Sequence, residues 1–214
     1  MERKALFITF EGPEGAGKST QIKLLKEYLE SLGRKVLVTR EPGGTPLAED
    51  FRNIVKHYQG EEPLFPATEL LLFEAARTQH TNYVIAPALK DGIIVLCDRF
   101  ADSTEAYQGA GRALDMDFLL KLNNFAMAEC KPDLTLLFDL PIEVGMERAR
   151  ARVAHIANHN DRLEAEKMDF HQRVRDSFLA IAKREPERVR VLDATQSIEE
   201  LFAEVKGLVN NALS

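Results

Sequence analysis

Eight residues near the start of the chain constrain its fold more than any other segment. Residues 12–19 read Gly-Pro-Glu-Gly-Ala-Gly-Lys-Ser, which matches the pattern G-x-x-x-x-G-K-[ST]. A short apolar run, residues 6–10, precedes them, and a stretch of helical spacing, residues 20–32, follows. In this context consecutive backbone N–H groups can surround phosphate oxygens at the start of a helix. The match therefore predicts a nucleoside triphosphate site and disfavours an ordinary glycine-rich turn.

The polar side chains of this loop have separate expected tasks. Lys18 should reach the β and γ phosphates, and the Ser19 hydroxyl should ligate Mg²⁺. The residues expected to bind the triphosphate here are Gly12, Pro13, Glu14, Gly15, Ala16, Gly17, Lys18, Ser19 and Thr20.

Short apolar runs and longer stretches of helical spacing alternate along the chain. The runs are residues 6–10, 36–39, 93–97, 134–138 and 189–192. The helical stretches are residues 20–32, 68–89, 117–128, 143–152, 164–183 and 198–213. Near-continuous apolar runs suit strands that are buried on both faces of a parallel sheet. We therefore predict a single α/β domain, residues 1–214, with five parallel strands and helices on both faces. Ligands of such sheets bind at the carboxyl ends of the strands.

Charge and composition exclude several classes of protein. Lys and Arg number 28 against 34 Asp and Glu, a net charge of −6, which does not suit a protein that coats nucleic acid. Cys97 and Cys130 have no metal-ligand spacing, and we expect them to be reduced and near the core. No apolar run approaches the roughly 18 residues of a membrane span. The first residues also lack the cleavage site of a signal peptide. We therefore expect a cytoplasmic protein with no nucleic-acid or membrane partner.

The third apolar run ends in Cys97-Asp98-Arg99-Phe100. Asp98 is placed to hold Mg²⁺ directly or through water. Arg99 suits a second anionic substrate better than simple hydrolysis, although a solvated surface arginine is the alternative. The Asn-Lys-x-Asp pattern of a GTPase is not present in the sequence.

Six segments together resemble the thymidylate kinase family. They are residues 10–19, 39–45, 72–77, Asp98-Arg99-Phe100 leading to Ser103, Tyr107, Gln108 and Gly109, residues 147–152 and residues 192–194. The resemblance runs from about residue 6 to about residue 205. Many families share the first segment, but Arg-Glu-Pro-Gly-Gly-Thr and Asp-Arg-Phe followed by Tyr-Gln-Gly are more specific. The resemblance implies a P-loop fold with a helical lid, Mg²⁺-dependent transfer of the γ-phosphoryl group of ATP to dTMP, and a homodimer.

The resemblance also assigns the acceptor site. It implies that Arg99 grips the 5′-phosphate of dTMP, with Arg40 nearby, because guanidinium groups suit bidentate phosphate binding. Phe73 would stack on thymine, and Arg77 would donate hydrogen bonds to the base. Spacing alone would favour a core Phe73 beside a surface Arg77.

The remaining expected contacts with dTMP also come from the resemblance. Tyr107 would pack against the sugar, and Glu14 would accept from the 3′-OH. Ser103, Thr104 and Gln108 are polar candidates for contacts with or near the base, and the sequence leaves open whether Ser103 or Thr104 reads it.

A lid over the site is expected at about residues 148–164. Gly15 stands where some thymidylate kinases have an arginine, so the lid would supply the missing charge. The resemblance implies that Arg148 stacks near adenine and that Arg152 approaches the transferring phosphoryl group, with Arg162 as a second candidate. A solvated arginine-rich helix is the alternative.

The segment 153–160 is longer than the expected linker, and it leaves the register of Arg152 and Arg162 open. It contains His155 and His159, which could ligate a metal if helical. Incidental histidines are the favoured interpretation, since no carboxylate or cysteine completes a site.

Two other functions compete with this one. Another P-loop kinase is possible, such as a deoxynucleoside kinase or a different nucleoside monophosphate kinase, but two phosphate-binding arginines argue against an uncharged nucleoside. A non-catalytic ATP-binding protein or a simple ATPase is disfavoured by the intact Lys18, Ser19, Asp98 and Arg99. The stretches 68–89 and 117–128 could form a dimer face, or equally the core.

Overall fold

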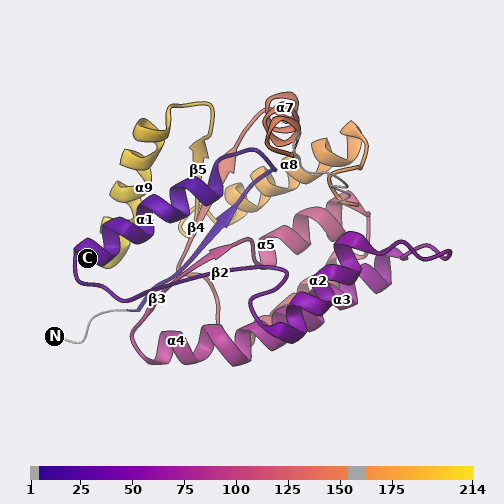
Figure 1. The fold of residues 1–214 in the computed structure, drawn as a ribbon, viewed down its shortest axis with the longest axis horizontal. Helices are drawn as coiled ribbons and strands as arrows, with labels where there is room; N and C mark the ends of the chain where they lie inside the picture. The colour runs from indigo at the N-terminus through magenta and orange to yellow at the C-terminus, as the bar shows by residue number, and fades with distance from the viewer. Residues whose placement is uncertain (1–4, 154–161) are drawn as a thin grey trace.

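Five parallel strands form one sheet at the centre of the computed structural model (Figure 1). The structure describes residues 5–153 and 162–214, and the side chains of residues 152 and 153 are also outside it. The strands are β1 (Phe7–Glu11), β2 (Val36–Arg40), β3 (Ile94–Asp98), β4 (Leu134–Asp139) and β5 (Val189–Asp193). Their order is β2-β3-β1-β4-β5, which confirms the predicted five-stranded parallel sheet.

Each strand continues one residue past its predicted apolar run. The additional residues are Glu11, Arg40, Asp98, Asp139 and Asp193. They stay in register with their neighbours: Asp98 pairs with Phe10 on one side and with Arg40 on the other. The carboxyl ends of the strands therefore present charged side chains at one edge of the sheet.

The helices follow the strands in the predicted alternation. They are α1 (Lys18–Ser31), α2 (Pro46–His57), α3 (Pro66–His80), α4 (Ala86–Lys90), α5 (Ala101–Thr104), α6 (Met116–Met127), α7 (Ile142–Val153), α8 (Met168–Arg184) and α9 (Ile198–Leu213). Two π-helical turns, η1 (Thr81–Ile85) and η2 (Glu105–Gly111), continue α3 and α5.

Side chains of β1 alternate between two hydrophobic cores. Ile8 and Phe10 pack with α1 and α9, whereas Phe7 packs with Ile85 and with Ala88 of α4. Figure 1 shows α1 and α9 on one side of the sheet and α2, α3 and α4 on the other. The prediction of helices on both faces is therefore confirmed.

The structure corrects the predicted helices in three places. Of the stretch 164–183, residues 164–167 are not helical, and α8 begins at Met168. The stretch 68–89 is three consecutive segments, α3, η1 and α4, because Pro87 has no N–H to donate to the carbonyl of Tyr83 and the helix widens there. Helix α2 was not predicted. Thr45 caps it by accepting from the Ala48 N–H at 3.1 Å, and Pro46 follows as the first residue.

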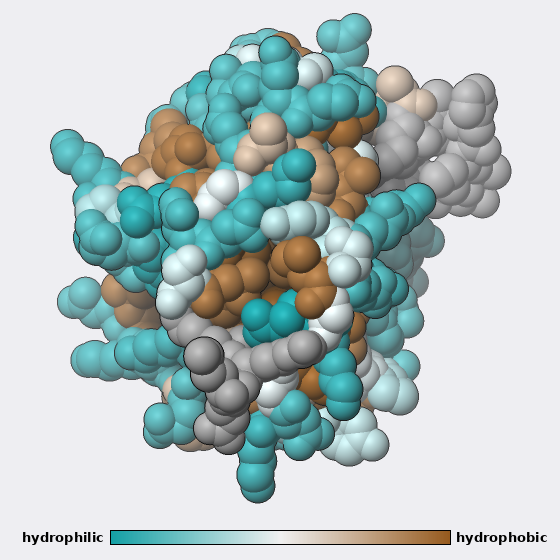
Figure 2. Space-filling model, turned by 90° about the vertical axis from the view of Figure 1, so that its left-hand side faces the viewer, coloured by the Kyte–Doolittle hydropathy of each residue, from teal (hydrophilic) through white to brown (hydrophobic). Residues whose placement is uncertain are grey.

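Figure 2 faces the amino ends of the strands. Hydrophilic residues cover most of this surface, and hydrophobic ones show in a central hollow and in smaller areas around it. Cys97 and Cys130 are both buried and unpaired, as expected. Within residues 5–153 and 162–214, no helix combines the length and apolar character of a membrane span.

Candidate active site

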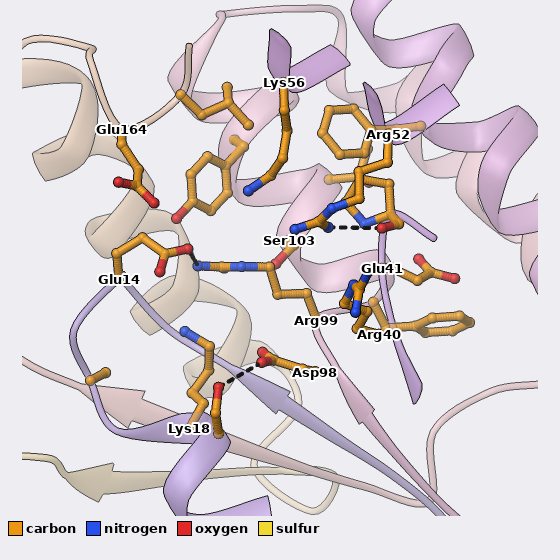
Figure 3. A pocket seen from close by; sticks show the side chains of 18 of the residues that line it. Glu14, Lys18, Arg40, Glu41, Arg52, Lys56, Asp98, Arg99, Ser103 and Glu164 are labelled. Carbon is orange, nitrogen blue, oxygen red and sulfur yellow. Dashed lines mark hydrogen bonds and ion pairs between the residues drawn. The ribbon is translucent and has the colours of Figure 1, made fainter. Parts of the chain in front are cut away.

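A cavity of about 570 Å³ opens at the carboxyl ends of β1, β2 and β3. Its lining combines the predicted phosphate-binding loop with residues of α2, α3, α5 and η2. Figure 3 shows Glu14, Lys18, Asp98 and Arg99 directed toward a common space. The cavity therefore joins most of the residues predicted for the triphosphate with most of those predicted for the acceptor.

Glycines allow the loop to pack closely against its surroundings. Gly12 has a φ of 125°, and a Cβ there would lie 2.3 Å from the carbonyl oxygen of Phe138. Gly15 has a φ of 75°, and its Cβ would lie 2.3 Å from the carbonyl oxygen of Gly145 in α7. Both positions need a residue without a Cβ, so the loop is held against β4 and α7.

Lys18 is the first residue of α1 and is buried. Its ammonium group donates to the carbonyl oxygens of Gly12 at 3.1 Å and Pro13 at 2.8 Å. Burial and the nearby Arg99 lower the pKa of Lys18. An ammonium folded onto its own loop in this way is ready to exchange carbonyl oxygens for phosphate oxygens.

Ser19 and Asp98 lie together beside Lys18. The Ser19 hydroxyl donates to Asp98 Oδ2 at 3.3 Å (Figure 3), and Asp98 Oδ1 is buried without a hydrogen-bond partner. A hydroxyl oxygen and a carboxylate oxygen without a hydrogen-bond partner are ligands of the kind that Mg²⁺ prefers. In the described parts of the chain, no three His, Cys, Asp or Glu residues form a metal cluster. These two residues therefore fit a Mg²⁺ ion that is held mainly by nucleotide phosphates and water.

Arg99 lies one residue beyond β3, at the centre of the cavity. Its guanidinium donates to Glu14 Oε1 at 3.0 Å and to Ser103 Oγ at 3.2 Å. It also lies 5.1 Å from the ring centroid of Tyr107, a cation–π contact. Arg99 is thus fixed by three neighbours, all of them predicted site residues.

Charge around Glu14 keeps that residue ionised. Burial raises the pKa of Glu14, but Arg99 and Lys18 lower it more, and the net pKa lies well below its usual range. A carboxylate between two cations can accept a hydrogen bond from a sugar hydroxyl without being protonated itself.

Arg77 is held more firmly than the sequence suggested. Its side chain is 1% exposed, and Nε donates to Glu41 at 2.8 Å. Nη1 donates to Glu74 at 2.8 Å and to Asn123 at 2.7 Å. Burial opposes its charge, but Glu41 and Glu74 raise the pKa of Arg77. The guanidinium therefore lines the cavity as a fixed, charged plane.

The structure separates Ser103 from Thr104. Thr104 Oγ1 accepts from Arg77 Nη2 at 2.9 Å, on the side of Phe73, which also lines the cavity. Ser103 lies instead with Arg99. Gln108 lines the cavity and donates its amide to Glu69 Oε1 at 3.0 Å.

Three arginines lie apart from the central cluster. Arg40 is 54% exposed and donates to both carboxylate oxygens of Glu49 at 3.0 Å, so it lies at the edge of the cavity. Arg148 donates to the carbonyl of Ala194 at 3.0 Å and lines the cavity.

Arg162 donates to the carbonyl of Val55 at 2.8 Å and to Glu69 at 3.3 Å. It is not among the residues that line the cavity. The side chain of Arg152, together with His155 and His159, lies outside the described residues.

Two cationic residues of the cavity, Arg52 and Lys56, were not found from the sequence. Both come from α2 (Figure 3), and Arg52 donates to the Pro42 carbonyl at 2.8 Å. Their spacing of four residues places them on one face of the helix. The sequence signal that bears on them is Thr45-Pro46, which marks the start of the helix that carries both.

The phosphate-binding loop shares one cavity with Arg77 and Arg99, at one edge of a five-stranded parallel sheet. This arrangement places the chain among the P-loop nucleotide kinases. The family model described as thymidylate kinase matches residues 10–205. The chain therefore belongs to the thymidylate kinase family.

Relatives with the same description cover nearly the whole chain. A thymidylate kinase of Geobacter sulfurreducens is 49% identical over 206 residues, 96% of each protein. One of Ectopseudomonas mendocina is 49% identical over 208 residues, 97% of this chain and 96% of the relative. The crystal structure of thymidylate kinase from Ehrlichia chaffeensis has a TM-score of 0.76 and 36% identity, and covers 96% of this chain and 98% of that one.

Proposed function

We propose that this chain carries out the reaction of its family in the cavity described above. It transfers the γ-phosphoryl group of ATP to dTMP, which gives dTDP and ADP for dTTP biosynthesis. The observation that supports this proposal best is the shared cavity. Lys18, Arg99 and Glu14 all line it, and both cations lower the pKa of Glu14. Because the donor and acceptor residues share one space, a direct transfer between two bound nucleotides needs no intermediate on the protein.

The loop and α1 bind the triphosphate in this proposal. Backbone N–H groups of residues 14–20 surround the phosphates, and Lys18 moves from the carbonyls of Gly12 and Pro13 to the β and γ phosphates. Ser19 and Asp98 hold Mg²⁺, which neutralises phosphate charge when it is bound. Arg148, held at Ala194 beside the loop, packs near adenine.

The other end of the cavity binds dTMP. Arg99 donates to the 5′-phosphate, with Arg40 at the edge, and so places an acceptor oxygen toward the γ phosphate. Phe73 stacks on the thymine ring, while Arg77, Thr104 and Gln108 provide hydrogen bonds to it. Tyr107 packs against the sugar, where a 2′-hydroxyl would need room, and Glu14 accepts from the 3′-OH. Arg152, from the lid, is assigned to the transferring phosphoryl group on the family resemblance alone.

An acceptor panel tests this function directly. With ATP and Mg²⁺, we expect ADP release to be fastest with dTMP among dTMP, dUMP, CMP, GMP and thymidine. A fixed Arg77–Thr104 pair leaves hydrogen-bonding groups unpaired when the base is wrong. For CMP and GMP we therefore expect kcat/KM to be lower by at least about a hundredfold.

Two outcomes of the panel contradict the proposal. A better acceptor than dTMP would indicate a different nucleotide kinase. ADP release that is equally fast without any acceptor would indicate a simple ATPase.

We also infer that two copies of the chain associate. Apolar side chains stand exposed on two helices that pack on each other, α3 and α6: Leu71 is 55% exposed, Phe118 58% and Phe125 76%. Phe118 and Phe125 are seven residues apart and share one face of α6. A symmetric dimer would bury this apolar surface, and the family resemblance also indicates a homodimer.

Replacing Phe125 by Glu should break this dimer. The twofold axis repeats the substitution on both copies, so two carboxylates enter the same apolar interface. We expect light scattering to give the mass of one chain for F125E and of two chains for the unchanged protein. Leu32→Glu is the matched control, since Leu32 is also 50% exposed but follows α1 on the far side of the sheet. A dimeric F125E, or a monomeric L32E, would contradict this interface.

The same proposal covers the setting of the enzyme. We treat residues 1–214 as one domain, supported by strands from both halves of the chain in one sheet. The free, buried thiols of Cys97 and Cys130 support a reducing, cytoplasmic compartment. A net charge of −6 supports small nucleotides rather than nucleic acid as partners.

A further inference from the structure

Glu11, the last residue of β1, carries a buried carboxylate that the proposed reaction does not use. Its exposure is 0%. Oε1 accepts from the backbone N–H of Phe100 at 2.8 Å, and Oε2 accepts from the Ser103 hydroxyl at 2.6 Å. Both partners follow Arg99 in the chain within four residues, so Glu11 binds the segment that directly follows the central arginine.

The first of these hydrogen bonds acts on the backbone of Arg99. Arg99 has a φ of 68°, in the left-handed region that residues with a Cβ rarely adopt without support. Its own N–H donates to the Phe10 carbonyl at 3.0 Å, and the next N–H, that of Phe100, donates to Glu11. Two consecutive residues of β1 therefore hold the turn that directs Arg99 into the cavity.

The second hydrogen bond acts on the side chain of Arg99. An ionised carboxylate can only accept, so the Ser103 proton is committed to Glu11 and the lone pairs of Ser103 Oγ stay available. Arg99 Nη1 donates to that oxygen at 3.2 Å. The result is a directed chain from Arg99 through Ser103 to Glu11.

The location of Glu11 is costly for a carboxylate. Burial, and then Asp102 of α5, raise its pKa to about 7, although Arg99 and the hydrogen bonds from Ser103 and Phe100 lower it. Charged groups that face Glu11 are thus Asp102 from α5 and Arg99 after β3, together with Lys18 of α1. An uncharged residue would avoid this cost, which indicates that the carboxylate serves the arrangement of Arg99 rather than folding alone.

We propose that Glu11 is a positioning residue for the acceptor-phosphate site: it fixes the backbone of Arg99 and the hydroxyl of Ser103, and so presents the guanidinium to the phosphate of dTMP. This inference rests on the proposed function, in which Arg99 binds that phosphate. It predicts that changes at Glu11 affect dTMP and spare ATP.

Glu11→Gln tests the inference through the two KM values. The amide can still accept from Phe100, but its NH₂ group cannot accept from Ser103. We expect the KM for dTMP to rise about tenfold, as for one lost charge-assisted hydrogen bond, and the KM for ATP to stay within about twofold. Ser103→Ala should raise the KM for dTMP by about threefold to tenfold. The double variant should be no worse than the more affected single variant, because both substitutions break the same chain of bonds.

Thr9→Val is the matched control. Thr9 lies two residues earlier on β1, is equally buried, and bonds only Thr135 among the described side chains, at 2.7 Å. We expect T9V to lower the melting temperature and to leave both KM values unchanged. If E11Q does not fold, Glu11→Asp keeps the charge with a shorter reach, and it should raise the KM for dTMP by about threefold with no change for ATP.

Several results would overturn the inference. Equal increases in both KM values would make Glu11 a support of the whole loop. Unchanged KM values in E11Q, or in E11D where E11Q does not fold, would show that Glu11 does not position Arg99. Additive effects of E11Q and S103A would show that Ser103 does not act through Glu11. A failure of the proposed function itself is separate, since it would appear in the acceptor panel of the unchanged enzyme.

Discussion

Replacing Lys18 by Met should lower kcat by about a thousandfold. In phosphoryl transfer the protein contributes positioning and charge, and removing one such group typically costs about 10² to 10³ in rate or more. Lys18 is buried at the loop, 2.8 Å from the Pro13 carbonyl, and its replacement leaves no other cation in the loop itself. Steady-state assays with saturating dTMP and varied ATP would measure the effect. We expect the KM for ATP to change by less than about tenfold, because the backbone N–H groups of the loop remain.

Lys23→Met is the control for this substitution. Lys23 lies on the same helix, α1, but is exposed to solvent. We expect its kcat to equal that of the unchanged enzyme, with similar melting temperatures for both variants. A K18M enzyme that keeps more than a tenth of its kcat would exclude Lys18 from phosphoryl transfer.

Gly15 explains why the sequence has no arginine within the loop. Its φ is 75°, and a Cβ at this position would lie 2.3 Å from the Gly145 carbonyl oxygen, so any larger side chain would strain the loop or separate it from α7. Additional positive charge must come from outside the loop. Arg148 of α7 stands next to this position, since its Cβ would lie 3.1 Å from a Cβ on Gly15. The sequence indicated the missing charge, but only the structure gives its steric cause.

The sheet could be predicted from the sequence because its signal is local. Five apolar runs correspond to β1–β5, and each run ends one residue before its strand because the final charged residue still belongs to the ladder. Helices with a clear apolar stripe were also predicted, and α9 has the predicted bounds, Ile198–Leu213. Helix α2 was not predicted, because its capping residue Thr45 belongs to the glycine-rich segment that precedes it.

The site was predictable in its members but not in its contacts. Motif spacing identified Lys18, Ser19, Asp98 and Arg99, which share the cavity. It could not show that Arg77 is bound by Glu41, because that partner lies 36 residues away in the sequence. It also could not separate Arg40, which is 54% exposed and pairs with Glu49 at the edge, from Arg99, which is 14% exposed. Partners that are distant in sequence decide which arginine is exposed and which is fixed.

Arg99→Ala should lower kcat/KM for dTMP by about 10² to 10⁴. Two charge-assisted hydrogen bonds to a phosphate contribute about 1.5–3 kcal/mol each, and both would be lost. The side chain is only 14% exposed, so solvent screens these interactions little. Its removal should also raise the pKa of Glu14, because Arg99 is the largest of the causes that lower it. The repulsion between Glu14 and the phosphate of dTMP then adds to the loss.

Arg40→Ala distinguishes phosphate binding by Arg99 itself from attraction of dTMP by the total positive charge of the cavity. Arg40 is 54% exposed and already paired with Glu49, and exposed ion pairs contribute at most about 1 kcal/mol. We therefore expect kcat/KM for dTMP to fall by less than about tenfold in R40A, and the KM for ATP to be unchanged in both variants. Equal losses in R40A and R99A would mean that the cavity attracts dTMP by its total charge. A large loss in R99A alone means that one guanidinium, fixed by Glu14, Ser103 and Tyr107, sets the place of the acceptor phosphate.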